Sequence, residues 1–128
     1  ESYNSNPLSL SSALQNFDKI KVDKIRKHIV LGDMLELGKH SIKLHKDISQ
    51  KINKTSVNKV HVVGKYIKET FKKINSNKKG KILNNDSEIN DLIKQELNNG
   101  DYLMIKGSNS TGLFNFVSKL KKRNNNVL

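Results

Sequence analysis

Amphipathic segments and short apolar runs alternate along this 128-residue chain, and this alternation constrains the fold more than any other feature of the sequence. Apolar residues recur at the i, i+3, i+4 and i+7 spacing that predicts a helix in four segments, and a fifth has a narrower stripe at spacing four. These segments lie at residues 10–17, 67–74, 89–97, 113–120 and, for the narrower stripe, 44–52. Runs rich in β-branched residues, each as long as a buried strand, lie between them at residues 28–31, 60–63, 102–105 and, more weakly, 81–83.

Strict alternation predicts βαβ units, and hence an α/β fold with a mostly parallel sheet covered on both faces. In such a unit a strand precedes the first helix, and here that strand would lie before Glu1. We therefore expect a truncated first strand and a chain that is a piece of a larger protein. Asn6 suits the cap of the first helix and Pro7 its first position. The length fits one domain, which we place at residues 1–123 with a tail at 124–128.

The net charge of +12 raises the possibility of nucleic-acid binding. However, of the 24 basic residues only Arg26 and Arg123 are arginines, the residue type that binds phosphates and bases bidentately. The lysines are dispersed, so a solvated basic surface is favoured and no nucleic-acid partner is expected. The sequence has no run of 18 apolar residues, so no membrane span is predicted. Cysteine is absent, which excludes disulfides and thiolate chemistry and fits a cytoplasmic location.

Three loops between a strand and a helix attract attention, because ligands of open α/β sheets bind at the carboxyl ends of strands. They are residues 1–7, 32–38 and 106–112. In the second loop, Asp33 could hold a ligand amine or order a metal-bound water, or could simply cap a short turn. In the third, Lys106 and the serine hydroxyls beside a helix N-terminus suit a carboxylate or phosphate. Leu113 stands where a nucleotide P-loop needs lysine, which argues against that motif.

The four histidines show no metal-binding or nucleophile-activating spacing. His28 and His61 lie in predicted strands and are expected to be structural. His45 could face the Asp33 loop, although a lone histidine more often packs in the interior or lies at the surface. No catalytic residue and no metal ligand is assigned.

Taken together, the three loops resemble those of the Mur ligases of peptidoglycan synthesis, in particular the branch that adds D-alanyl-D-alanine. "ESYNSNP" stands at that branch's Asp-Ser-Tyr-Asn-Ala-Asn-Pro loop, "GDMLELG" matches Gly-Asp-Met-x-Glu-Leu-Gly, and "KGSNS" stands at Lys-Gly-Ser-Arg-Ser. Ser41 and His45 match a serine and a histidine that follow the second loop. The match covers nearly the whole chain. There are two departures: Glu1 replaces an aspartate, and Asn109 replaces an arginine near the substrate carboxylate, a loss for which Lys106 could compensate.

The resemblance implies a three-layer, Rossmann-like C-terminal domain, which closes over an ATP-bearing central domain of a cytoplasmic bacterial ligase. The parent enzyme would use ATP and Mg²⁺, held mainly by the central domain, to phosphorylate the carboxylate of UDP-MurNAc-tripeptide. The amine of D-Ala-D-Ala would then attack the acyl phosphate. The partners are thus ATP, the two substrates and the enzyme's own N-terminal and central domains, and the isolated domain would not catalyse.

The resemblance also implies roles for eight residues. Nucleotide contacts are expected from Glu1, Asn4 and Asn6, with Glu1 at the ribose. Asp33 and Glu36 would position or guide the dipeptide amine. The dipeptide carboxylate would be bound by Lys106, Ser108 and Ser110.

Three other functions stay open at this stage. A sister Mur ligase would add an amino acid instead of a dipeptide. A stand-alone Rossmann-like module would grip an anionic small molecule. A basic nucleic-acid-binding domain would bind DNA or RNA with a steep salt dependence.

Overall fold

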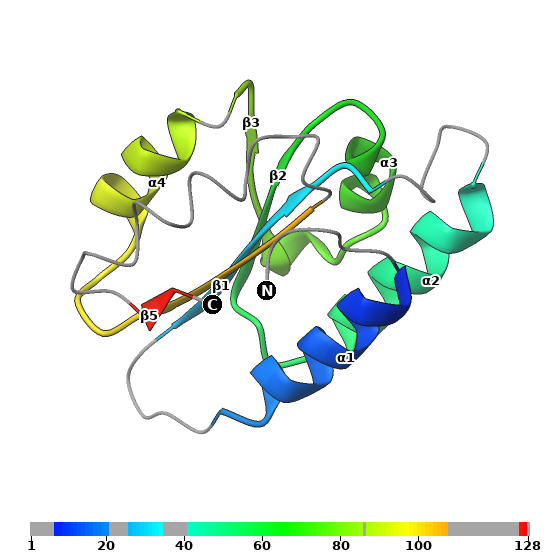
Figure 1. The fold of residues 1–128 in the computed structure, drawn as a ribbon, viewed down its shortest axis with the longest axis horizontal. Coiled ribbons are helices and arrows are strands. Elements are labelled where there is room, and N and C mark those ends of the chain that lie inside the picture. Colours follow the sequence, from blue (N-terminus) through cyan, green and yellow to red (C-terminus); the bar gives the residue numbers. More distant parts are fainter. Residues whose placement is uncertain (1–6, 21–25, 35–40, 86, 108–125, 128) are drawn as a thin grey trace.

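The computed structural model describes residues 7–20, 26–34, 41–85, 87–107 and 126–127. Helices and strands alternate along these residues (Figure 1). The helices are α1 (Pro7–Asp18), α2 (Ile42–Asn53), α3 (Ile67–Lys72) and α4 (Glu88–Glu96), with a 3-10 turn at Ser76–Lys78. The strands are β1 (Lys27–Gly32), β2 (Lys59–Val63), β3 (Lys79–Leu83), β4 (Tyr102–Lys106) and β5 (Asn126–Val127).

The strands form one sheet in the order β3-β2-β1-β4-β5, and each neighbouring pair is parallel. The α/β fold with a parallel sheet, predicted from the alternation, is therefore confirmed. The sheet order reverses direction between β1 and β4, because the chain leaves β1 towards β2 and β3 and later returns to the other side of β1. This reversal is the topological switch point at which open α/β sheets bind ligands.

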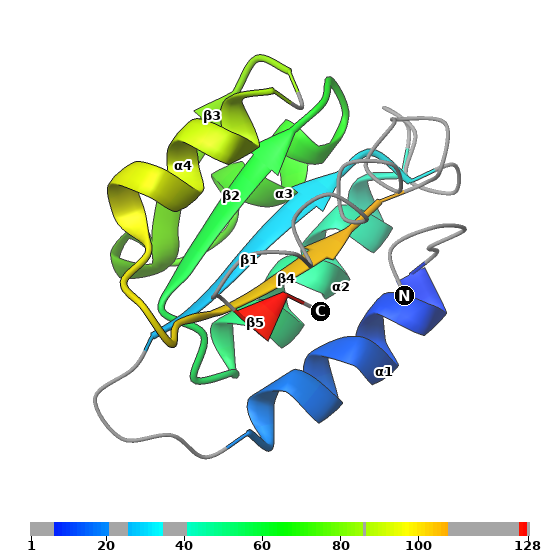
Figure 2. The same ribbon diagram turned by 60° about the vertical axis from the view of Figure 1, so that its left-hand side comes forward.

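Helices cover both faces of the sheet, which gives three layers (Figure 2). Helices α1, α2 and α3 lie on one face and α4 lies on the other (Figure 1). Successive residues of a strand point to opposite faces, so Ile29 and Leu31 join the core beneath the first three helices, whereas Val30 joins the core beneath α4. β1, β2 and β4 are thus buried on both faces along most of their length, which explains why their sequences are apolar runs, whereas β3 is largely exposed and has the weaker run.

The predicted elements correspond closely to the observed ones. All four predicted strands are present, each within two residues of its expected start, and α1 begins at Pro7 as expected. α3 ends at Lys72, two residues before the predicted helix end. Residues 126–127, expected in the tail, instead form β5, which pairs with β4 at Tyr102 and Leu103. The helix predicted at 113–120 lies outside the described residues.

A pair of buried histidines occupies the α4 side of the sheet. The rings of His28 and His61 stack with centroids 5.5 Å apart, and His28 Nδ1 lies 3.2 Å from His61 Nε2. Space for the His61 ring comes from Gly80 of β3, since a Cβ at that position would lie 2.2 Å from His61 Nδ1. Both histidines are nearly inaccessible to solvent, which confirms the structural role expected from the sequence.

Candidate functional site

The carboxyl ends of β1, β2 and β4 meet at one edge of the sheet. In the register of the strands, Leu31 of β1 pairs with Lys106 of β4, and Gly32 pairs with Val63 of β2. The connections that follow these strands therefore leave the sheet side by side. Both β1 and β4 point towards the side where α1 begins (Figure 2). Residues 32–34 and 106–107, which are the described starts of the second and third loops singled out in the sequence, thus lie at this carboxyl edge at the switch point.

The carboxylate of Asp33 binds the main chain of the neighbouring connection. Its Oδ2 accepts a hydrogen bond from the N–H of Lys65 at 3.0 Å. Its Oδ1 accepts from the N–H groups of Tyr66 at 3.0 Å and Ile67 at 2.8 Å. Tyr66 is the N-cap of α3 but provides no side-chain cap, so Asp33 satisfies these orphan N–H groups from another strand. The negative charge also suits the positive end of the helix dipole.

Gly64 allows this close approach. Its φ of +133° is a conformation that other residues rarely adopt, and a Cβ there would lie 2.6 Å from Asp33 Cγ. The aspartate therefore caps a turn, but this turn lies more than thirty residues away and not in its own loop. The sequence left open that Asp33 caps a turn in its own loop. In the structure it caps a turn that follows the neighbouring strand instead.

Helix α3 is in turn fixed to α2 by a buried polar contact. His45 Nδ1 of α2 lies 2.6 Å from Thr70 Oγ1 of α3, and both side chains are fully buried. His45 therefore packs between helices, the alternative that the sequence favoured over facing the Asp33 loop. Since α2 follows the loop that begins at Asp33, these contacts tie both ends of that loop to the same helix.

Lys106 is the last residue of β4 and lies beside Leu31 at the carboxyl edge. Its side chain is only 7% exposed. Lys106 therefore lies at the predicted edge, but little of it is open to solvent. The other predicted contact residues lie outside the described residues: Glu1, Asn4, Asn6, Glu36, Ser108 and Ser110.

Sequence reasoning missed the connection between β2 and α3, residues 64–66. Lys65 is exposed there, and its Nζ lies 5.5 Å from the centroid of the Tyr66 ring. The only signal in the sequence was a glycine directly after a strand, which is common in turns. Sheet order, which the sequence did not reveal, is what brings this connection next to Asp33.

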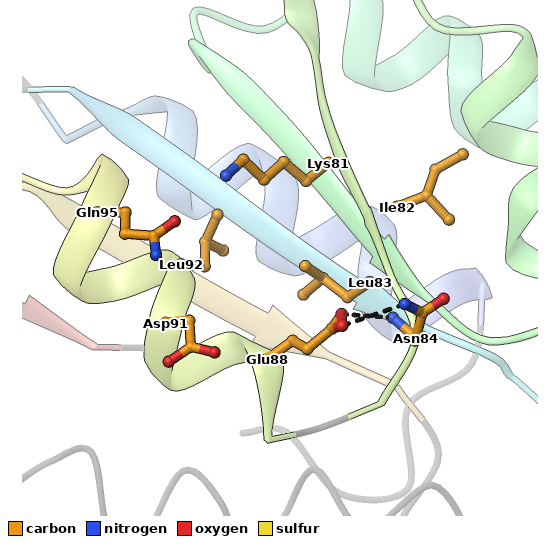
Figure 3. Close-up of a pocket in the computed structure, with 8 residues that line it drawn as sticks. All are labelled: Lys81, Ile82, Leu83, Asn84, Glu88, Asp91, Leu92 and Gln95. Atoms are coloured by element: carbon orange, nitrogen blue, oxygen red, sulfur yellow. Dashed lines mark hydrogen bonds between the residues drawn. The ribbon is translucent and has the colours of Figure 1, made fainter.

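A hollow of about 270 Å³ lies elsewhere, between β3 and α4 (Figure 3). Glu88 accepts hydrogen bonds there from the main-chain N–H of Asn84 at 2.7 Å and its side-chain amide at 3.1 Å. Lys81, which also lines the hollow, pairs with Glu96 at 3.1 Å. This hollow is at the β3 edge of the sheet, away from the switch point, and its main polar contacts are between its own residues. The carboxyl edge of β1, β2 and β4 is the stronger candidate.

The buried histidine pair is electrostatically distinctive. Burial, together with the neighbouring His28, lowers the pKa of His61 to about 4. Burial also lowers the pKa of His28, although Asp101 opposes this effect. His28 Nε2 lies 3.6 Å from Asp101 Oδ2, too long for a hydrogen bond. Both histidines are therefore neutral at pH 7.

Among the described residues, no three His, Asp or Glu side chains gather as a metal-binding group. In the same part of the chain, none of the helices has the length and apolar character needed to cross a membrane.

Comparison with known proteins bears on the carboxyl-edge loops directly. Residues 2–109 match the family described as "Mur ligase, glutamate ligase domain". The chain belongs to this family. The resemblance seen in the three loops is thereby confirmed, and the chain corresponds to the C-terminal domain of a Mur ligase.

Similar curated proteins carry the name UDP-N-acetylmuramoyl-tripeptide–D-alanyl-D-alanine ligase. That of Buchnera aphidicola subsp. Baizongia pistaciae is 33% identical over 124 residues, covering 95% of this chain and 26% of the relative. That of Rickettsia prowazekii is 30% identical over 115 residues, covering 90% of this chain and 25% of the relative. The chain thus spans about a quarter of the length of these relatives.

Solved structures confirm the fold. A MurF ligase from Thermotoga maritima, in complex with ADP, matches with a TM-score of 0.73 at 20% identity, over 94% of this chain and 27% of that one. A MurF structure from Acinetobacter baumannii matches with a TM-score of 0.73 at 22% identity, over 95% of this chain and 27% of that one.

Proposed function

We propose that the full-length protein is an ATP-dependent ligase that joins D-alanyl-D-alanine to UDP-MurNAc-tripeptide, and that this Mur ligase domain supplies the dipeptide-binding edge. One observation carries the proposal most: two of the loops that resemble the D-alanyl-D-alanine-adding branch begin side by side, at the ends of β1 and β4, at the topological switch point. The relatives match nearly the whole chain, and their names support the same branch.

The reaction needs positioning more than covalent chemistry from this domain. The terminal carboxylate of the tripeptide is phosphorylated by ATP, and the dipeptide amine displaces phosphate from the acyl phosphate. A domain that holds the dipeptide and closes over the nucleotide aligns the amine and excludes water from a hydrolysable intermediate. ATP and Mg²⁺ are held mainly by the central domain in this proposal, and the enzyme is a bacterial cytoplasmic one.

Roles for single residues follow from the resemblance of the loops to the D-alanyl-D-alanine-adding branch. Glu36, Ser108 and Ser110 contact the dipeptide, and Lys106 supports its carboxylate from the end of β4. Asp33 acts through the turn that it binds, because its oxygens accept three main-chain hydrogen bonds. The nucleotide is contacted by a separate group at the start of the chain: Glu1, Asn4 and Asn6.

ADP release by the full-length protein tests this proposal. ATP, Mg²⁺ and UDP-MurNAc-tripeptide are supplied with and without D-Ala-D-Ala. We expect release to depend on the dipeptide and to fall in a Ser108→Ala variant. Release that requires a single amino acid instead would indicate a sister Mur ligase, and no release with any acceptor would overturn the ligase assignment.

A further inference from the structure

The carboxyl edge needs a cation that the predicted site does not provide in exposed form. Asn109 stands where the related branch has arginine, and Lys106 is only 7% exposed. An incoming dipeptide carries a carboxylate that must be held while its amine attacks. A charge-assisted hydrogen bond to a cation is the interaction that suits this task.

Lys65 meets this need. Among the described residues directly after β1, β2 and β4, namely 33–34, 64–66 and 107, it is the one with an exposed positive charge. Its strand, β2, lies next to β1, whose loop begins at Asp33. Lys65 thus lies at the same edge of the sheet at which the proposed dipeptide loops begin.

The main chain of Lys65 is held in place by the contacts already described. Its N–H donates to Asp33 Oδ2, and Gly64 before it has the positive φ that brings the turn against the carboxylate. Thr70, further along α3, is fixed to α2. The main-chain position from which the Lys65 side chain extends is therefore preorganised, which reduces the entropic cost of binding an anion.

The side chain of Lys65 also has a defined neighbour. Its Nζ lies 5.5 Å from the centroid of the Tyr66 ring, within the range of a cation–π contact. The carboxylate oxygens of Asp33 are directed at main-chain N–H groups, and the carboxylate of Glu69 pairs with Lys72. No hydrogen bond or ion pair to the ammonium group of Lys65 is found within the described part of the chain.

We propose that Lys65 Nζ binds an oxyanion of the reactants at the carboxyl edge, and that this oxyanion is the carboxylate of the D-alanyl-D-alanine acceptor. The inference rests on the proposed ligase function. The other oxyanion that Lys65 could bind is a phosphate, either of ATP or of the acyl phosphate. Asp33 is then a positioning residue, which sets the place of Lys65 through its main chain.

Steady-state kinetics of the full-length ligase with Lys65→Met tests this inference. Methionine keeps an unbranched side chain but removes the charge. We expect the KM for D-Ala-D-Ala to rise about tenfold or more, with kcat and the KM for ATP unchanged. Lys65→Arg restores most of the affinity. Lys68→Met, which removes an exposed lysine from the next turn, serves as the matched control and leaves the kinetics unchanged.

A dipeptide analogue distinguishes the two anions. With D-alanyl-D-alaninamide, which has no carboxylate, we expect wild type and Lys65→Met to have the same KM. A variant effect that persists with the amide, or that appears in the KM for ATP, would overturn the carboxylate assignment and indicate a phosphate. Wild-type ligation with no effect of Lys65→Met on any parameter would overturn the inference alone. Absence of ligation by the wild type would overturn the proposed function itself.

Discussion

At the scale of single residues, Asp33 shows how a site residue can have a role that its own loop does not reveal. Its carboxylate binds three N–H groups at the start of α3, and Gly64 leaves just enough room for it. The sequence located Asp33 at the carboxyl end of a strand correctly. It could not identify its partners, because they belong to another strand and become neighbours only through sheet order.

Gly64→Ala tests the close approach. The new Cβ would lie 2.6 Å from Asp33 Cγ at a φ of +133°, so either the turn or the carboxylate must move. We expect the full-length protein to lose about 1–3 kcal/mol of stability, seen as a lower melting temperature. Lys65→Ala, one residue later, keeps the main-chain hydrogen bond and should leave the melting temperature nearly unchanged. Equal melting temperatures for Gly64→Ala and wild type would show that the turn is not constrained by Asp33.

The buried histidines predict a dependence of stability on pH. Lys81 donates its main-chain N–H to His61 Nδ1 at 2.9 Å, so that nitrogen carries no proton in the folded state. The pKa of His61 is about 4 when folded and 6.5 when unfolded, so below pH 6.5 the unfolded state binds more protons. The free energy of unfolding therefore falls as the pH drops from 6.5 towards 4, by up to about 3 kcal/mol for this group. The slope from His61 fades as the pH rises above 6.5, because the unfolded-state histidine then also loses its proton.

His61→Gln isolates this effect, because glutamine offers an oxygen to the Lys81 N–H but does not titrate. The variant and wild type are melted at about pH 7 and about pH 5. We expect the melting temperature to fall more between these two pH values for the wild type than for the variant. The charged groups that act on the pair, Arg26, Lys59, Lys81, Glu96 and Asp101, are unchanged in both proteins. An identical loss in both would mean that His61 does not cause the pH dependence.

At the scale of elements, β1, β2 and β4 were predictable because they are buried on both faces. Ile29, Val30 and Leu31 are all inaccessible to solvent, so the apolar run marks the strand without ambiguity. β5 was not predictable, because two residues in an asparagine-rich segment have no strand signal and depend on pairing with β4. The end of α3 was overestimated, since the apolar stripe continues to Ile74 although the α-helix ends at Lys72.

A buried polar contact with α2 helps to hold α3 in place. Thr70→Val keeps the shape of the side chain but removes the hydroxyl partner of His45 Nδ1. We expect a loss of about 1–3 kcal/mol and faster amide hydrogen exchange in α3. Thr55→Val is the matched control, because the hydrogen bonds of Thr55 Oγ1 to the described residues are with the end of its own helix and the following turn. Unchanged exchange in α3 of the Thr70 variant would show that packing alone fixes the helix.

At the scale of the whole molecule, the order of the strands creates the site. The sequence predicted the alternation, the parallel sheet and three of the connections at its carboxyl edge. It did not predict the order β3-β2-β1-β4-β5, which brings the connection after β2 next to Asp33. For this reason Lys65 was overlooked, whereas Lys106 and Asp33 were recognised from motifs within single loops.

The central claim is that this domain presents an edge for a dipeptide acceptor. Mass spectrometry of the reaction product tests it most directly. The full-length protein is incubated with ATP, Mg²⁺ and UDP-MurNAc-tripeptide in an equimolar mixture of D-Ala-D-Ala and single amino acids. We predict one product, the tripeptide substrate extended by D-Ala-D-Ala with loss of water. A product extended by a single amino acid, or unmodified substrate after prolonged incubation, would contradict the account.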